Sequence, residues 1–422
     1  MLLKRGEIFT GAANSALLNK AGPGIIGAYG TGAKPVIRSL STNTYAVLMN
    51  FGVSDDWRVM DLDIDGQSDV HRNFLSASGA FTLTRLLMLR IDAHDLGGGI
   101  IIFTGANTPA VPDQVSLVDS TITRIKAELG SAGVEASFWS GRRMGILGNT
   151  FDDTTQGAAE HLIRVQYADR AVFSHNLLRK AHTGKEMFAL RAPCATGACG
   201  PFGTGDAAAT KFVVVSRNQI ETNTYIGIQV DTAAINNLAD AIIRDVIFES
   251  NWYPTQPGGG PCMKIRAVRV TVRNEICDLT NAPATTGIQV FGPTTGGAYG
   301  SSDVWIYNNT IYSGGAQTNM ILASLQSPPV NNLVIRNNLV YGLKSTTTYI
   351  VTGGTGSTYS QDTNGIGDPS FASTPATNPN DLRLNAGSYA IGAGAGVPVF
   401  MDFHGQPRQP GSALDVGAVL PR

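Results

Sequence analysis

One short phrase recurs seven times in the middle of this 422-residue chain: a run rich in Val, Ile and Phe that ends in asparagine, with another apolar or aromatic residue two positions later. Its asparagines are Asn149, Asn176, Asn218, Asn251, Asn274, Asn309 and Asn338. Consecutive asparagines are 23 to 42 residues apart, so the repeat tolerates insertions. Repetition of one strand-like unit at such intervals indicates a solenoid, in which each repeat stacks on the one before.

The intervals between phrases also constrain how the strands pair. Parallel strands need a long return path, and 23 to 42 residues supply a full turn around a coil. Equivalent asparagines would then lie above one another and hydrogen-bond along a ladder. Asparagine is also common in β-turns, but seven placements in one context make coincidence a poor explanation.

Inward apolar residues and an asparagine ladder at a turn resemble the right-handed parallel β-helix of the pectate-lyase-like superfamily. The 49 glycines and the charged fraction of only 15% also suit a turn-rich β protein. We therefore predict an all-β, single-domain right-handed parallel β-helix of roughly ten to twelve coils with a C-terminal capping tail. The helix is expected to span residues 1–345, with a truncated N-terminal coil, and the last coil and the tail residues 346–422.

The C-terminal region differs from the repeat. The phrases GDPSF, DLRLNAGSYAIGAGAG and MDFHGQPRQPGSALDVGA resemble a tail that is common in secreted bacterial β-helix proteins. We expect this tail to cover the last coil, so that no open sheet edge remains. Asp402, Arg408 and Asp415 are accordingly predicted to pack within the tail and not to form a catalytic site.

The formal net charge of −1 gives no indication of nucleic-acid binding. No apolar stretch is long enough to span a bilayer, and the start MLLKRGEIFTG lacks the features of a signal peptide. The resemblance to secreted proteins nevertheless implies a secreted or periplasmic protein whose secretion signal has been removed. We further expect a monomer, because the C-terminal end is predicted to be closed.

The chain contains four cysteines, Cys194, Cys199, Cys262 and Cys277. Four cysteines allow three pairings, and the sequence does not choose among them, although the CATGAC segment could close a small loop. No cysteine or histidine spacing typical of a zinc site accompanies them. We predict disulfides formed in an oxidising compartment.

A second repeat predicts a polar stripe on one sheet. Because strand side chains alternate, Ile163, Leu190, Ile228, Ile265 and Ile288 should point inward, and Arg164, Arg191, Gln229, Arg266 and Gln289 outward. Arg164 and Arg191 are 27 residues apart, as are Asn149 and Asn176, so we place them as neighbours on adjacent coils. Like charges on neighbouring strands repel unless a negative group lies between them. That group would be Glu160 or Glu186, or a carboxylate or sulfate of a substrate.

The segment from Glu160 to Arg191 is rich in basic residues and holds three of the six histidines. Its phrase GKEMFALRAP resembles in outline the chondroitinase-B-like and alginate lyases, in which a lysine and an arginine act beside acidic calcium ligands. The resemblance implies β-elimination at a uronic acid of an anionic polysaccharide. It assigns Lys185 as the base, with His161 or His175 as alternatives, and Arg191 as the partner of the uronate carboxylate. Predicted substrate-binding residues are Arg164, Gln229, Arg266, Trp252 and Tyr253, and predicted ligands of a Ca²⁺ ion are Glu160 and Glu186.

Two other classes of function remain open. A β-helix hydrolase would need two carboxyl groups at a suitable separation, which separate coils could supply without leaving a sequence motif. A non-catalytic glycan-binding or spike protein could use exposed aromatic rings for stacking on sugars. The DLDIDG segment at residues 61–66 is predicted to be a strand that ends in an Asp-Gly turn, because the twelfth position of a calcium loop would be Arg72.

Overall fold

The computed structural model comprises two compact units, Met1–Val213 and Val214–Arg422, and each unit is described by itself. The structure describes residues 1–11, 17–39, 46–77, 82–102, 110–126, 136–154, 161–192, 202–203, 205–222, 225–231, 242–254, 260–282, 286–293, 299–314, 319–327, 329–342, 347–409 and 413–421. Cys194, Cys199 and Glu160 lie outside these ranges. Within them, no helix has the length and apolar character that crossing a bilayer requires.

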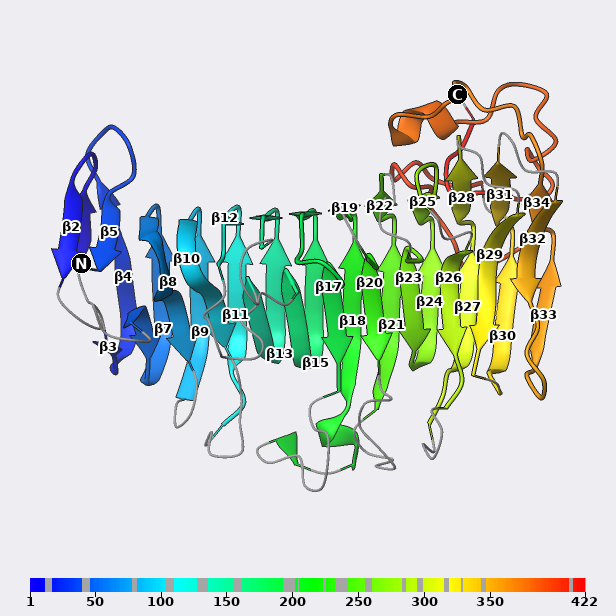
Figure 1. Ribbon diagram of the computed structural model, residues 1–422. Coiled ribbons are helices and arrows are strands. Elements are labelled where there is room, and N and C mark those ends of the chain that lie inside the picture. Colours follow the sequence, from blue (N-terminus) through cyan, green and yellow to red (C-terminus); the bar gives the residue numbers. More distant parts are fainter. Residues whose placement is uncertain are drawn as a thin grey trace. The chain divides into compact units, whose positions relative to one another are not determined.

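The first unit is built almost entirely of parallel strands (Figure 1). They are β1 (Leu2–Lys4), β2 (Ile8–Gly11), β3 (Leu17–Leu18), β4 (Ala21–Tyr29), β5 (Val36–Ser39), β6 (Ala46–Phe51), β7 (Val53–Met60), β8 (Asp63–Ala77), β9 (Thr82–Leu89), β10 (Asp92–Ile102), β11 (Asp113–Val118), β12 (Thr121–Thr123), β13 (Ser137–Leu147), β14 (Thr150–Asp152), β15 (Ile163–Ser174), β16 (Leu177–Arg179) and β17 (Phe188–Arg191), followed by the short 3-10 helix η2 (Gly205–Ala208).

These strands form three parallel faces around a core. Face 1 contains β1, β4, β7, β9, β11 and the second halves of β13 and β15. Face 2 contains β2, β5, the starts of β8 and β10, and then β12, β14 and β16. Face 3 contains β3, β6, the ends of β8 and β10, the starts of β13 and β15, and β17. The predicted parallel β-helix is therefore confirmed for this unit.

The core of the first unit follows from stacking of equivalent inward residues. On face 1, one column of directly opposed residues is at most 1% exposed and consists of Val59, Met88, Leu117, Ile146 and Phe173. Burying one such side chain contributes roughly 1.5–3 kcal/mol. Each coil thus adds the same apolar layer to the core of the coil before it.

The second unit repeats this architecture. Its strands are β18 (Thr210–Ser216, which begins in the first unit), β19 (Gln219–Glu221), β20 (Ile228–Asp231), β21 (Ile243–Glu249), β22 (Trp252–Tyr253), β23 (Met263–Arg266), β24 (Val268–Arg273), β25 (Ile276–Asp278), β26 (Thr286–Phe291), β27 (Ser302–Tyr307), β28 (Thr310–Ser313), β29 (Asn319–Gln326), β30 (Asn331–Arg336), β31 (Leu339–Gly342), β32 (Thr347–Thr352), β33 (Tyr359–Asp362) and β34 (Gly365–Ile366), and the tail contains the 3-10 helix η4 (Pro379–Leu382). Face 1 continues through β21, β24, β27, β30 and β33, face 2 through β19, β22, β25, β28, β31 and β34, and face 3 through β20, β23, β26, β29 and β32.

The corner between face 1 and face 2 turns at a residue with a positive φ angle. In the first unit these residues are Asp61, Arg90, Asp119, Gly148 and His175. The left-handed conformation is disfavoured for residues with a β-carbon, so its cost must be offset elsewhere in the turn. The residue that follows each of them occupies the position of the predicted ladder.

The asparagine ladder is confirmed in the first unit. Asn149 and Asn176 are buried, and the Asn176 Oδ1 accepts hydrogen bonds from the backbone N and the Nδ2 of Asn149, at 2.9 and 3.0 Å. The Asn149 Oδ1 in turn accepts from the Ser120 N at 2.9 Å. The ladder therefore satisfies backbone groups at the corner that would otherwise be buried without partners.

In the second unit one predicted member of the ladder is wrong. Asn251 donates from its backbone N and its Nδ2 to the Glu275 Oε1, at 3.1 and 2.9 Å, so Glu275 and not Asn274 is the ladder residue. Asn274 instead takes the left-handed turn position, with a φ of 54°. The same two positions are both asparagine in the later coils, at Asn308–Asn309 and Asn337–Asn338, and this explains why the prediction was displaced by one residue.

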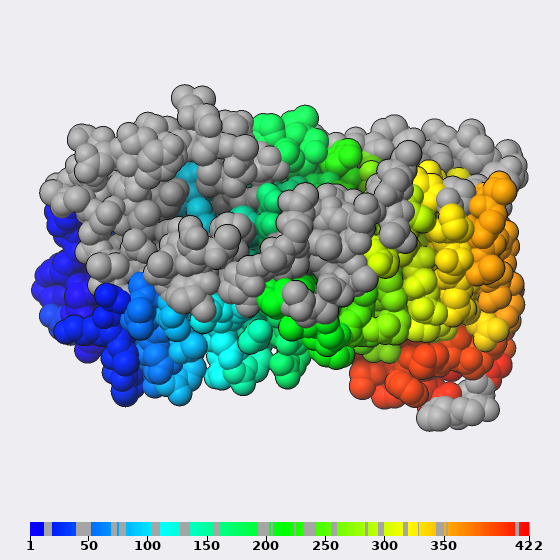
Figure 2. Space-filling view, turned by 90° about the horizontal axis from the view of Figure 1, so that it is seen from below, coloured from blue at the N-terminus to red at the C-terminus, as the bar shows by residue number. Residues whose placement is uncertain are grey.

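The C-terminal tail packs along the side of several coils. Its Phe371, Leu384 and Val416 share one apolar cluster with Tyr312 and Tyr341, among others, from face 2. Figure 1 and Figure 2 both show the tail, in orange and red, beside the last coils of this unit. Its placement thus differs from the expected cover across the last coil alone.

The three polar residues of the tail are structural, as predicted. Asp402 and Arg408 are 1% and 4% exposed. The Arg408 Nη2 donates to the Asn274 Oδ1 at 3.2 Å and to the Gly417 O at 2.9 Å, and the Asp415 Oδ1 accepts from the Gly392 N at 2.7 Å. These contacts anchor the tail to the corner of the helix.

A disulfide joins Cys262 and Cys277 in the second unit. Cys277 lies on β25 and Cys262 immediately precedes β23, so the bond links face 2 to face 3. The predicted use of cysteines in disulfides is confirmed for this pair.

Glu275 should make the stability of the second unit depend on pH. Burial raises its pKa to about 8, although the hydrogen bonds from Asn251 oppose this shift. Its stabilising contribution is then fully present below pH 4.5, the pKa of the unfolded state, and is lost as the pH rises through 8, to a total of about 4 kcal/mol. We expect Glu275→Gln to flatten the dependence of the melting temperature on pH between 5 and 9.

The matched control is Glu249→Gln, which removes a partly exposed glutamate of the same unit that pairs with Arg273. An unchanged pH profile in Glu275→Gln would show that Glu275 is not the titrating group.

Candidate functional site

The predicted arginines Arg164 and Arg191 lie on adjacent strands of face 3 of the first unit. The directly opposed pairs are Arg164 with Ala189 and Val165 with Leu190. Arg191 is thus displaced by two residues along the strand from the position opposite Arg164. The prediction of adjacent coils is correct, but the register is wrong by two residues, a shift that leaves every side chain on its predicted side.

The alternation predicted for this stripe is observed. The five residues expected to point inward, Ile163, Leu190, Ile228, Ile265 and Ile288, are at most 2% exposed. The five expected to point outward, Arg164, Arg191, Gln229, Arg266 and Gln289, are partly exposed.

Three predicted site residues come together at the edge of face 3. The His161 Nδ1 lies 2.9 Å from the Glu186 Oε2, and an Nη2 of Arg191 lies 3.8 Å from the Glu186 Oε1. The side chains of His161 and Glu186 are 6% and 8% exposed, whereas that of Arg191 is 18% exposed. A buried carboxylate therefore holds an arginine whose guanidinium reaches the surface.

Glu186 remains ionised in this setting. Burial acts to raise its pKa, but the hydrogen bond and charge of His161 and the charge of Arg191 outweigh burial and hold the pKa below its usual range. An ionised glutamate offers two acceptor oxygens to nitrogen donors. It thereby fixes the positions of both neighbouring side chains.

The calcium prediction fits these contacts poorly. Calcium prefers several oxygen ligands, yet both carboxylate oxygens of Glu186 face nitrogen groups. Glu160, the other predicted ligand, lies outside the described residues. No step of the chemistry below is assigned to calcium.

Lys185 and Arg164 flank this cluster in different ways. Lys185 directly precedes Glu186 and is partly exposed, and its backbone N donates to the His182 O at 3.0 Å. The guanidinium of Arg164 lies 5.0 Å from the ring centroid of Phe138, in a cation–π contact that fixes the side chain on face 3.

His175 does not belong to this group. It is an exposed residue with a φ of 58° at the corner between faces 1 and 2, where its Nδ1 lies 2.8 Å from the Ser174 Oγ. Arg164 lies at the opposite end of β15, on face 3. The structure therefore separates this alternative base from the arginines.

Two predicted substrate-binding residues form a polar network in the second unit. The Arg266 Nη1 lies 2.9 Å from the Asp231 Oδ1, and the Gln229 Nε2 donates to the Asp231 Oδ2 at 3.2 Å. Gln229 is directly opposed to Lys264, and not to Arg266, which repeats the two-residue register error. Arg266 also packs on the ring of Phe291 and is 11% exposed in its side chain.

The predicted aromatic binding residues are buried. Trp252 and Tyr253 are 7% and 1% exposed, so the expectation that they are exposed is wrong. Trp252 belongs to the apolar cluster that holds the tail. Their burial follows from the tail and from the neighbouring coil, neither of which the local sequence reveals.

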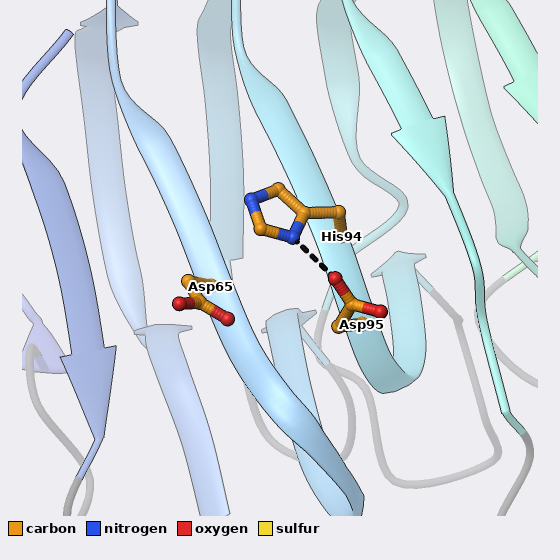
Figure 3. A group of neighbouring side chains, drawn as sticks. All are labelled: Asp65, His94 and Asp95. Carbon is orange, nitrogen blue, oxygen red and sulfur yellow. Dashed lines mark hydrogen bonds and ion pairs between the residues drawn. The ribbon is translucent and has the colours of Figure 1, made fainter.

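A second polar cluster lies on face 2 of the first unit and was not predicted. Figure 3 shows His94 and Asp95 on β10 with Asp65 on the adjacent β8. The His94 Nδ1 lies 2.7 Å from the Asp95 Oδ2, and its Nε2 lies 3.0 Å from the Asp63 Oδ1. Asp65, His94 and Asp95 each offer one metal-ligating atom within 4.8 Å of the others.

Charge pairing explains this cluster without a metal ion. The hydrogen bond to Asp63 raises the pKa of His94 to about 9 against the effect of burial, with Asp95 adding to the shift. A protonated histidine cannot bind a metal. Arg124 holds the pKa of Asp95 far below its usual range through two hydrogen bonds, and Arg38 donates to Asp65 at 2.8 Å.

A sequence signal for this cluster exists. Residues 62–66 (LDIDG) and 91–95 (IDAHD) are equivalent segments 29 residues apart, and they place Asp65 directly opposite His94. The earlier coils lack the asparagine by which the repeat was recognised, since Leu62 and Ile91 precede Ser120 at that position. The predicted strand through Asp63 and Asp65 is confirmed, and the Gln67 N donates to the Asp65 Oδ1 at 2.7 Å in the bend that follows.

Comparison with known proteins supports the fold. No protein-family model matches the sequence, and no characterised protein matches it in sequence. The A-module of the mannuronan C-5 epimerase AlgE4 from Azotobacter vinelandii aligns over 85% of this chain and 90% of its own, with a TM-score of 0.53 and 13% identity. An alginate lyase from Paenibacillus sp. (TM-score 0.45, 16% identity, 77% of this chain and 90% of that one) and the Dettilon tailspike protein (0.48, 11%, 86% and 61%) are also similar. The chain thus has the parallel β-helix fold of the pectate-lyase-like proteins.

The charge network around His94 should be sensitive to alkaline pH. With a raised pKa, its contribution to stability is complete below pH 6.5 and is lost as the pH rises through 9. Allowing for solvent screening of this partly exposed group, the loss should be about 1–2 kcal/mol. We expect His94→Gln to lower stability at pH 6 but to remove the decline between pH 7 and 10. His182→Gln, outside the cluster, should keep the wild-type decline; a His94→Gln variant that retains the decline would contradict the assignment.

Proposed function

We propose that this protein is a polysaccharide lyase that cleaves a uronic-acid-containing polysaccharide by β-elimination on face 3 of its first unit. The observation that carries the proposal is the surface-reaching Arg191, held by the buried pair of Glu186 and His161. Arg164 on the adjacent strand supplies a second guanidinium on the same face. The parallel β-helix fold is compatible with such a site but does not by itself define it.

β-Elimination sets two requirements for such a site. The proton on the carbon next to the uronate carboxylate is weakly acidic, so the carboxylate must be neutralised as negative charge develops. A base then takes this proton, a carbon–carbon double bond forms, and the bond to the glycosidic oxygen breaks, with a proton added to the leaving oxygen. The product chain carries an unsaturated uronate.

Arg191 is suited to the first requirement. A guanidinium pairs with carboxylates through parallel hydrogen bonds and remains charged. Its contact with Glu186 at 3.8 Å is longer than a direct hydrogen bond, so the interaction positions the side chain by charge. We assign Arg191 to the uronate carboxylate and Glu186 to positioning Arg191.

Lys185 is the proposed base. It lies next to Glu186 in sequence and is partly exposed, so its amine has access to a substrate on this face. His161 is only 6% exposed in its side chain and is directed at Glu186, which favours a positioning role. The Cys262–Cys277 disulfide supports the further proposal that the protein acts outside the cytoplasm, in an oxidising compartment.

The test is ultraviolet absorbance of unsaturated uronate during incubation with alginate, polygalacturonate and glycosaminoglycans. We expect a rise on one polymer, and a fall in turnover of about 10²–10³-fold in Arg191→Ala, because one donor to the developing charge is lost. Arg179→Ala is the control, since this arginine pairs with Asp152 on face 2.

Three outcomes would contradict parts of the proposal. Arg191→Ala with activity close to wild type would remove Arg191 from the site. New reducing ends without absorbance would indicate a hydrolase, and neither signal on any of the polymers would favour a non-catalytic glycan-binding protein.

A further inference from the structure

A groove of about 490 Å³ lies on face 1 of the first unit, away from the residues assigned above. It crosses β7, β9, β11 and β13, which follow one another along this face in Figure 1. Among the residues that line it, three are arginines, Arg58, Arg85 and Arg143, and one is an aspartate, Asp56. The lining therefore has an excess of two positive charges.

The groove is hollow because outward side chains shrink along one column. Arg58 is directly opposed to Leu87, Leu87 to Ser116, and Ser116 to Gly145. A β-carbon added at Gly145 would lie 3.3 Å from the Ser116 Oγ, so the small residues here already fill the available space at the base of the column. Large side chains on one side and small ones on the other leave a depression in the sheet.

The rim of the groove is a row of turn residues with positive φ angles. Arg85, Gln114 and Arg143 have φ values of 50°, 56° and 52° and occupy equivalent positions on successive coils. Coils are spaced by about 4.8 Å, so Arg85 and Arg143 stand roughly 10 Å apart along the face. The rim thus presents two guanidiniums at a fixed interval, with an amide between them.

Each rim arginine is braced by an aspartate of the preceding coil. Arg85 donates from Nε and Nη2 to Asp55, and Arg143 does the same to Asp113. Both side chains are nevertheless 51% exposed. A guanidinium has five N–H donors, so two bonds to aspartate leave others for a ligand. Bracing reduces the conformational entropy that each arginine would lose on binding.

From these features we infer that this groove binds a stretch of acidic polysaccharide, with carboxylate or sulfate groups of the sugars at Arg85 and Arg143. The interval between the two arginines suits a polymer that presents anionic groups repeatedly along one side. Leu87 offers an apolar surface for the C–H face of a sugar ring, and Gln114 and Ser116 offer hydrogen bonds to hydroxyl groups. The groove shares the substrate class of the proposed function but requires no cleavage, and it would hold the polymer on a different face from Arg191.

Affinity electrophoresis in native gels that contain alginate or polygalacturonate tests this inference. The key variant is Arg85→Gln combined with Arg143→Gln. Arg90→Gln is the matched control, because Arg90 follows the same strand as Arg85, has a φ of 52°, makes the same paired bonds to Asp61, is 47% exposed, and lies outside the groove. All three proteins carry Arg191→Ala as well, so that the polymer is not consumed.

We expect the double variant to bind the acidic polymer at least about tenfold more weakly than its parent. Arg90→Gln should change the affinity by less than about twofold. The inference is overturned if the double variant binds like its parent, if Arg90→Gln loses as much affinity, or if the parent binds no acidic polymer. Equal retention by polyglutamate, which has charge but no sugar rings, would also overturn it.

The outcome is independent of the proposed elimination. Wild-type protein that binds through the groove but gives no ultraviolet signal would refute the lyase and leave the groove standing. An ultraviolet signal with no effect of the double variant on affinity would do the reverse.

Discussion

In-register pairing between coils is the constraint on which the rest of this structure depends. Every residue of a parallel β-helix meets the equivalent residue of the next coil, which is 29 residues away in the regular part of the first unit, as for Asp63 with Asp92 and Thr121 with Thr150. An apolar residue therefore needs an apolar counterpart, and a buried polar residue needs a counterpart that completes its hydrogen bonds. The asparagine ladder meets this second need, because one amide can accept from the coil before it and donate to a backbone carbonyl, as Asn149 does to Leu117.

The same constraint decides what happens where the pattern is broken. Glu275 replaces an asparagine and accepts the same two hydrogen bonds from Asn251, but it brings an ionisable group into a position with only 2% exposure. The surroundings cannot solvate a second charge, so the carboxyl is held in its neutral form near neutral pH. On the surface the constraint is weaker, and arginines such as Arg85 and Arg143 combine a structural pairing with exposure to solvent.

The sequence predicted the fold well because stacking leaves a periodic trace. Asn149, Asn309 and similar residues repeat one local environment, and inward residues such as Ile163 and Ile265 keep their alternation even where the register was displaced by two. The site was harder to predict, because its contacts join residues of different coils. Glu186 beside His161 and Arg191 was partly anticipated, whereas His94 between Asp63 and Asp95 was missed. Trp252 was misjudged because the tail that buries it lies more than one hundred residues later in the chain.

The alternating charges of the corner columns bear on how such a chain can change length. At one corner of the first unit Asp61 is followed by Arg90 and then Asp119, and at another Asp95 by Arg124, Asp153 and Lys180. Loss of the single coil that carries Arg90 would set Asp61 against Asp119, whereas loss of two consecutive coils would preserve the alternation. Like charges stacked on neighbouring strands are destabilising. Duplication or deletion of coils during evolution is therefore easier in pairs than singly, so that the column of charges acts as a parity rule on the length of the helix.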